Sequence, residues 1–230
     1  MKIDRHLNQY HGKLSAAQVA SGMNHSLANA KRLISDAELL LANNRYPSAL
    51  GLAILAIEEY GKVPILRSLT TAKTDEDIEY WWKAYRTHTK KNLALMFPEM
   101  VASGAKHFED FISMFSQREF PRVIDNLKQI SFYTDCLGKV HWSVPTEVIN
   151  EELVKAVVNY SKHYVWKIVE VTEMEIQLWV KHIGPVLSAD LPTMKSALED
   201  FCMELKNAGL LKEDIKINYE LLHKEIYWKH

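Results

Sequence analysis

Acidic and basic side chains follow directly after the most apolar stretch of the chain, in the segment LAILAIEEYGK at 52–62. Glu58 and Lys62 are four residues apart, which places them side by side on a helix in the orientation that favours an ion pair. Glu58 and Glu59 both adjoin rows of apolar positions, where an unpaired carboxylate is costly and needs a partner or a raised pKa. The segment therefore predicts either a structural network where helices meet or a polar centre that faces a cleft.

Aromatic and basic residues are interleaved in a second segment, YWWKAYRTHTKKN at 80–92. Its basic residues include Arg86, His88, Lys90 and Lys91. Such a patch could bind phosphate, although a solvated run of charge is the usual explanation. On a helix, His88 shares a face with Trp81 and Tyr85 and adjoins Lys91. A histidine on an aromatic stripe is more often a hydrogen-bonded core residue than a catalyst, so both interpretations stay open.

A third segment, SFYTDCLGKVHW at 131–142, contains Tyr133 and Asp135 at the end of an expected helix. Taken alone, Asp135 is a capping or turn residue. Metal-ligand patterns are weak, because Glu220 and His223 form one Glu-x-x-His pair where a di-iron bundle needs two. The sequence also lacks the glycine-rich phosphate loops and the nucleophile-elbow motif. We therefore expect neither a metal nor a cofactor.

Composition predicts a helical, cytoplasmic protein. Of the 230 residues 47% are hydrophobic, and the 8 glycines and 7 prolines leave few places to interrupt long helices. The net charge of −1 predicts no general attraction to nucleic acid, and no DNA specificity is evident. The longest apolar run, 49–57, is far shorter than the ~20 residues of a membrane span, and the two isolated cysteines fit a reduced compartment.

The helical periodicity predicts an all-α bundle of four to five main helices with a short helical C-terminal extension. The expected helices lie at 15–44, 47–71, 74–96, 107–116, 121–133 and 146–183. The last of them contains neither glycine nor proline and is expected to be one rod of ~50 Å. A linker at 184–192 separates the bundle, 1–183, from the extension, 184–230, which we expect to pack on the bundle.

The order and spacing of several motifs resemble the AbiV family of abortive-infection proteins. The matching residues are Asn29-Ala30, Asp36-Ala37, Arg45-Tyr46, Glu58-Glu59-Tyr60-Gly61-Lys62, His88, Lys91, Tyr133, Asp135, Gly138, Trp142 and Pro145. The resemblance covers roughly 15–180 and implies an all-α domain of the HEPN type. Such domains commonly pair into homodimers, and many are metal-independent ribonucleases. AbiV-like proteins defend bacteria against phage, in some cases by shutting off translation.

The resemblance leaves catalysis open. Ribonucleolytic HEPN domains typically carry an arginine and a histidine separated by four to six residues, near the start of a late helix. The match in this chain is Arg5 and His11, which lie in the polar lead-in before the first expected helix. The remaining polar motif residues are expected to be structural: Asn29, Asp36, Tyr133 and Asp135.

Two functions follow from these features. In the first, the protein is a phage-defence effector that acts on RNA or the translation machinery, and metal-free RNA cleavage needs an acid, a base and cations for the phosphate. The residues assigned to it are His88 as acid or base, Glu58 or Glu59 to orient it, and Lys62, Arg86, Lys90 or Lys91 for phosphate. In the second, the protein is a non-enzymatic helical module that binds a phage or host protein.

Both functions are compatible with a homodimer. The expected helix at 146–183 carries a wide apolar surface that includes Trp166, Ile176 and Trp179. Because one neighbouring helix would not cover that width, we expect this surface to contribute to the dimer. Two sets of charged residues could then meet across the interface.

Overall fold

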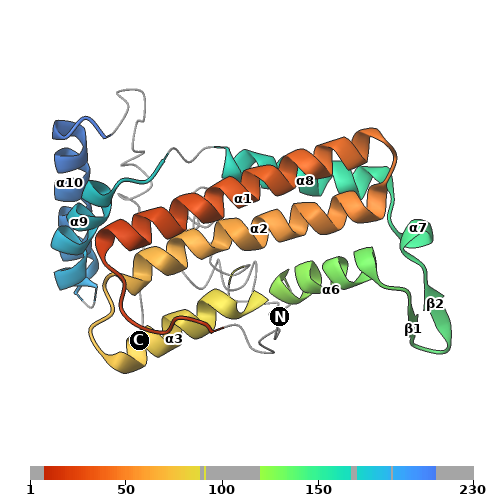
Figure 1. The fold of residues 1–230 in the computed structure, drawn as a ribbon, viewed down its shortest axis with the longest axis horizontal. Coiled ribbons are helices and arrows are strands. Elements are labelled where there is room, and N and C mark those ends of the chain that lie inside the picture. Colours follow the sequence, from red (N-terminus) through yellow and green to blue (C-terminus); the bar gives the residue numbers. More distant parts are fainter. Residues whose placement is uncertain (1–7, 89–90, 92–119, 167–169, 188, 211–230) are drawn as a thin grey trace, which may run out of the picture.

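Local signals set the bounds of the two longest helices, α1 (Ala16–Ala42) and α2 (Tyr46–Leu69), which lie side by side in the computed structural model (Figure 1). Ser15 caps α1, because its Oγ accepts from the amide of Gln18 at 3.2 Å and the Gln18 side chain accepts from the amide of Ser15 at 2.9 Å. Asn44 has a φ of 58°, a left-handed conformation that asparagine tolerates, and this lets the chain turn into α2.

Helix α2 is the central element of the bundle. The structure describes residues 8–88, 91, 120–166, 170–187 and 189–210. Within these residues, α2 contacts α1, α3 (Asp75–Arg86), α6 (Phe120–Phe132) and α8 (Glu151–Val165). Leu50, Ala53 and Ile54 are fully buried, as expected for a helix that is apolar on every side. The predicted all-α bundle is confirmed.

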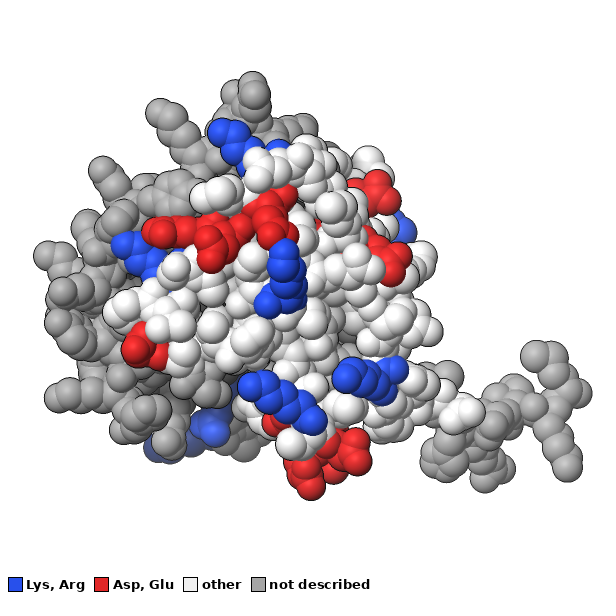
Figure 2. Space-filling view, turned by 90° about the vertical axis from the view of Figure 1, so that its left-hand side faces the viewer, with Lys and Arg blue, Asp and Glu red and all other residues white. Residues whose placement is uncertain are grey.

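The C-terminal helices pack on one end of the bundle. α9 (Glu173–His182) contacts α1, and α10 (Leu191–Asn207) follows the short 3-10 helix η1 (Gly184–Val186) and packs on α9. Trp179 and Phe201 meet edge to face, with ring centroids 5.5 Å apart. Seen from this end, the molecule carries interspersed acidic and basic side chains (Figure 2).

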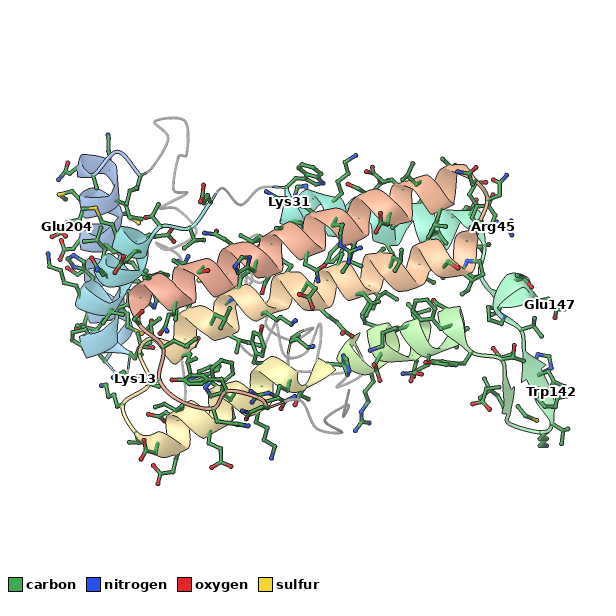
Figure 3. All side chains as sticks on the ribbon, in the orientation of Figure 1. Lys13, Lys31, Arg45, Trp142, Glu147 and Glu204 are labelled. Carbon is green, nitrogen blue, oxygen red and sulfur yellow. The ribbon has the colours of Figure 1, made fainter. Side chains whose placement is uncertain are left out.

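A short hairpin joins α6 to the next helix and extends away from the bundle (Figure 1). Its strands are β1 (Asp135–Leu137) and β2 (His141–Ser143), and the four-residue helix α7 (Pro145–Val148) follows. Gly138 adopts a positive φ of 53° in the turn. Trp142 lies on this hairpin with 60% of its surface exposed (Figure 3). The sequence predicted a loop or a brief extended turn here, which agrees with the hairpin.

The prediction of one long helix over 146–183 is wrong, because the chain forms α7, α8 and α9 instead. Side chains supply the hydrogen bonds that the interruptions require. Asn150 Oδ1 accepts from the amide of Leu153 at the start of α8, and Thr172 Oγ1 accepts from the amide of Glu175 at the start of α9. The side-chain amide of Asn24 on α1 bonds both peptide groups of Val171, at 2.8 Å each. Helix α1 therefore supplies hydrogen-bond partners to backbone groups that lie outside any helix.

The prediction that the third helix reaches 96 is also wrong. α3 ends at Arg86, and Thr87 is extended, with φ −96° and ψ 122°. Thr87 donates from Oγ1 to the carbonyl of Lys83 at 2.7 Å. Helical hydrogen bonding resumes beyond this break, where the amide of Lys91 donates to the carbonyl of Thr87 at 3.3 Å. The helix expected at 107–116 lies outside the described residues.

Less apolar surface is exposed on 146–183 than the sequence predicted. Ile176 is fully buried, and Trp179 packs on Phe201. Trp166 keeps 52% of its surface exposed. The homodimer therefore stays a prediction, with less apolar surface to support it. None of the described helices has the length and apolar character that crossing a membrane would require.

Replacing Asn24 with alanine should destabilise the fold by about 3 kcal/mol, because both peptide groups of the buried Val171 would lose their partners. Urea unfolding measures this change. Asn29→Ala on the same helix is the matched control, since the Asn29 amide bonds the exposed Arg32 side chain, and it should change stability by less than about 0.5 kcal/mol. Equal effects of the two substitutions would contradict the role given to Asn24.

Candidate functional site

Glu58 is a buried carboxylate that receives cations from two other parts of the fold. Its side chain is 3% exposed. Oε2 accepts from Nδ1 of His88 at 2.6 Å, and Oε1 accepts from Nζ of Lys128 at 2.7 Å. Nζ of Lys91 lies 3.8 Å from Oε2, and Lys128 also pairs with Asp125 at 2.8 Å. We call these five residues the Glu58 network.

Three elements bring the network together. Glu58 stands on the central helix α2, Lys128 on α6, and His88 and Lys91 in the segment that follows the break at Thr87. His88 and Lys128 lie 30 and 70 positions after Glu58 in the sequence. The structure thus gathers Glu58, His88 and Lys91, three of the residues that the sequence selected.

Gly61 allows the segment containing His88 and Lys91 to approach α2. A Cβ atom at this position would collide with the backbone carbonyl of Lys91. A carbonyl cannot swing aside as a flexible side chain can, so any larger residue would push the segment away from α2. The glycine of the EEYGK motif therefore has a packing reason that is independent of any chemistry.

Lys128 is the member of the network that sequence reasoning missed. It lies one turn after the buried Ile124 and three residues before the buried Ser131. A lysine on the apolar face of an amphipathic helix is a signal, because lysine is almost never buried without a partner. That signal points to a carboxylate elsewhere in the fold, which here is Glu58.

Burial and charge act in opposite directions on the two lysines. Burial lowers the pKa of Lys91, the nearby Lys62 and Lys128 lower it further, and the attraction of Glu58 does not offset them. Burial also acts to lower the pKa of Lys128, but its hydrogen bonds to Asp125 and Glu58 outweigh burial and raise that pKa. Lys128 is therefore the cation that the fold stabilises best beside Glu58.

Exposure separates His88 from the lysines. The side chains of Lys91 and Lys128 are 7% and 9% exposed, whereas that of His88 is 55% exposed. Nδ1 of His88 is engaged with Glu58, so Nε2 is the ring nitrogen left to exchange a proton at the surface. The arrangement can orient an imidazole for acid–base chemistry.

Glu59 and Lys62 form a second pair on α2. Lys62 donates to Glu59 at 2.5 Å, so the predicted ion pair between Lys62 and Glu58 is wrong. Nζ of Lys62 also lies 5.1 Å from the ring centroid of Tyr85 on α3. The position of Tyr85 and the cations already on Glu58 explain why Lys62 turns toward Glu59.

The Arg86 side chain contacts the segment that precedes α1. Its guanidinium donates to the carbonyl of Tyr10 at 2.5 Å and lies 5.0 Å from the ring centroid of Trp82. A role in phosphate binding would require Arg86 to give up these contacts. Lys90, the other residue assigned to phosphate, lies outside the described residues.

The residues expected to be structural lie in two places. Arg32 joins Asn29 to Asp36 on the outer side of α1, at 2.9 and 2.8 Å. Tyr133 is exposed at the start of the hairpin, where Asp135 accepts from the amide of Cys136 at 2.7 Å. In the part of the chain that the structure describes, no group of three or more His, Cys, Asp or Glu residues could hold a metal ion.

Substituting Lys128 with methionine should destabilise the protein by about 3 kcal/mol at neutral pH, because it removes a close partner of a buried carboxylate. Folding raises the pKa of Lys128, so its contribution is complete below the ordinary lysine pKa of 10.5 and is lost as the pH rises through the folded-state pKa. The difference between wild type and variant should therefore shrink in that alkaline range. Urea unfolding as a function of pH measures it.

Lys155→Met is the control for Lys128→Met. Lys155 also pairs with a glutamate, Glu151 at 2.6 Å, but its side chain is 56% exposed. Its loss should cost far less stability than the loss of Lys128, because solvent screens an exposed ion pair. A similar loss for both lysines would contradict the special place of Lys128.

Introducing alanine at Gly61 should destabilise the protein by about 2 kcal/mol, because the new methyl group overlaps the Lys91 carbonyl. Gly22→Ala tests the general effect of a helical glycine. There the new Cβ makes an ordinary contact of 3.4 Å with Leu66, so the better helix propensity of alanine should leave stability equal or higher. Thermal unfolding compares the two variants, and an unchanged Gly61→Ala protein would refute the close approach.

Comparison with known proteins identifies the family. The AbiV family model, which is of the HEPN type, matches residues 18–166, more than half of the chain and close to the range expected from the motifs. The comparisons with curated proteins and with solved structures gave no match. The matched range contains Glu58, His88, Lys91 and Lys128, and thus the whole network around the buried carboxylate. The chain belongs to the AbiV family of HEPN-type proteins, a family of abortive-infection defence.

Proposed function

We propose that this abortive-infection protein acts on RNA, with His88 as the acid–base group and Glu58 as the residue that orients it. The observation that carries the proposal is the half-exposed imidazole whose Nδ1 donates to a buried carboxylate at 2.6 Å. A carboxylate in this position fixes the tautomer and the orientation of the ring. Nε2 can then take a proton from a ribose 2′-hydroxyl or give one to a leaving oxygen.

The buried lysines support Glu58, which differs from the phosphate contact that the sequence assigned to Lys91. Lys91 and Lys128 are too buried to contact a phosphate directly, and both lie beside Glu58. They are the buried ion-pair partners of the carboxylate and hold it in place. Lys90, which the sequence assigned to phosphate and which lies two positions after His88, remains the candidate for phosphate contact.

A homodimer would complete the chemistry. Cleavage by transfer to the 2′-hydroxyl needs a base and an acid, and one His88 supplies a single proton-transfer group. Two copies of the chain that place their exposed His88 rings at one scissile phosphate would supply both. This arrangement extends the proposal, and it agrees with the common formation of homodimers by HEPN domains.

A non-enzymatic module is the second candidate, and one observation favours it. Glu58 joins α2, α6 and the segment after α3 through His88, Lys91 and Lys128, which is also what a purely structural network does. In this case the protein would act by binding a phage or host protein.

Changing His88 to alanine should reduce RNA cleavage at least ~100-fold, because it removes the proton-transfer group. Purified protein is incubated with cellular RNA, alone and with extract from phage-infected cells as a trigger, and the products are resolved on gels. His25→Ala is the control, since His25 is an exposed histidine on α1, and it should cleave as wild type does. Thermal unfolding of both variants separates loss of chemistry from loss of fold.

Other outcomes of these experiments would contradict the catalytic role of His88 or favour the binding module. Wild-type protein that leaves RNA intact under every condition, or a His88→Ala variant as active as wild type, would refute the catalytic role. If the wild type protects cells from phage without cleaving RNA, the binding module is favoured. Capture of a phage protein from infected but not from uninfected cells would then identify its partner.

A further inference from the structure

We propose that the lead-in segment, residues 8–14, is a strap that positions His88, with Trp82 and Arg86 on α3 as its anchoring residues. The inference rests on the proposed function, in which the orientation of His88 matters. It assigns a role to a segment that precedes the family match at residues 18–166. It also explains why Arg86, selected from the sequence for phosphate, is engaged within the chain.

The strap runs beside α3 and is bonded to it at two points (Figure 1). Trp82 donates from Nε1 to the carbonyl of Gly12 at 2.9 Å, and Arg86 donates to the carbonyl of Tyr10 at 2.5 Å. Nδ1 of His11 lies 3.3 Å from the same guanidinium. Figure 3 places Lys13 of the strap near α3, away from the hairpin. These bonds join residues 70 to 76 positions apart, so they are tertiary contacts and not local turns.

Most of the strap is exposed and forms no helix, and ordering such a backbone costs about 1–2 kcal/mol per residue. It stays in place because it covers Trp82, which is only 7% exposed and needs a partner for its indole N–H. Tyr10 meets the Trp82 ring edge to face, with centroids 6.0 Å apart. The strap and the last turns of α3 therefore stabilise each other.

A continuous series of contacts leads from the strap to the central helix. The rings of Trp82 and Tyr85 meet edge to face with centroids 5.5 Å apart, and Lys62 lies 5.1 Å from the Tyr85 ring. Lys62 in turn bonds Glu59, which adjoins Glu58. The strap therefore fixes α3 against the same turn of α2 that carries the buried carboxylate.

His88 lies between two fixed points. On its N-terminal side, Arg86 is held by the strap two residues away, across the extended Thr87. On its C-terminal side, the backbone of Lys91 is pressed against Gly61. A functional side chain keeps its orientation when the groups that support it are themselves fixed. Releasing the strap should free the first of these points and let the His88 ring leave Glu58.

The test uses full-length Arg86→Ala and Trp82→Phe, the second of which keeps an aromatic ring but loses the bond to Gly12. Nitrogen-15 NMR of the imidazole ring reports the tautomer of His88 directly. In wild type we expect the Nδ1–H form, and in both variants a mixture typical of a free exposed histidine. In the cleavage assay kcat should fall roughly ten- to a hundredfold with little change in KM. Arg86→Lys, which keeps a donor, should restore part of the loss.

Arg32→Ala is the matched control, because Arg32 makes comparable bonds to Asn29 and Asp36 on the outer side of α1. Its His88 signals and kcat should equal those of wild type. If Arg86→Ala fails to fold, Trp82→Phe alone decides. His88 signals that match wild type in the folded variants would overturn the strap. Because the NMR measurement does not require catalysis, it tests the strap even if the protein cleaves no RNA.

Discussion

The burial of one charge constrains the rest of this fold. Glu58 stands on the most enclosed helix of the bundle, where an unpaired carboxylate would cost several kcal/mol. Its partners cannot come from α2, since Lys62 pairs with Glu59. They come from α6 and from the segment after α3, and this ties the positions of both elements to a single side chain. The bundle is thus specified by a polar contact as well as by apolar packing.

Much of the fold could be predicted because its signals are local. The Ser15 cap and the Asn44 turn define α1, and the all-round apolar character of α2 makes it central. The breaks within the expected long helices could not be predicted, because the interactions that compensate them are tertiary. The bonds from Asn24 to Val171 involve residues 147 positions apart. A single sequence contains no sign of that pairing.

The candidate site was predictable in part for the same reason. Glu58 was selected because a carboxylate beside apolar rows needs a partner, and the structure supplies partners for it. The choice of partner depended on the tertiary fold, so Lys128 was missed and Lys62 was assigned to the wrong glutamate. Spacing along one helix shows which residues can meet, but it does not show which neighbouring helix will compete for them.

The basic residues around Glu58 differ in burial, and therefore in the groups that they can contact. Lys91 and Lys128 are enclosed beside Glu58, whereas His88 faces outward with 55% of its side chain exposed. A network that served stability alone would not need the second ring nitrogen of His88 to be accessible, since the bond to Glu58 uses Nδ1. A histidine that must exchange protons needs this combination of a buried acceptor on one nitrogen and an accessible second nitrogen. The exposure of His88 is therefore the feature that favours chemistry over a purely structural network at this site.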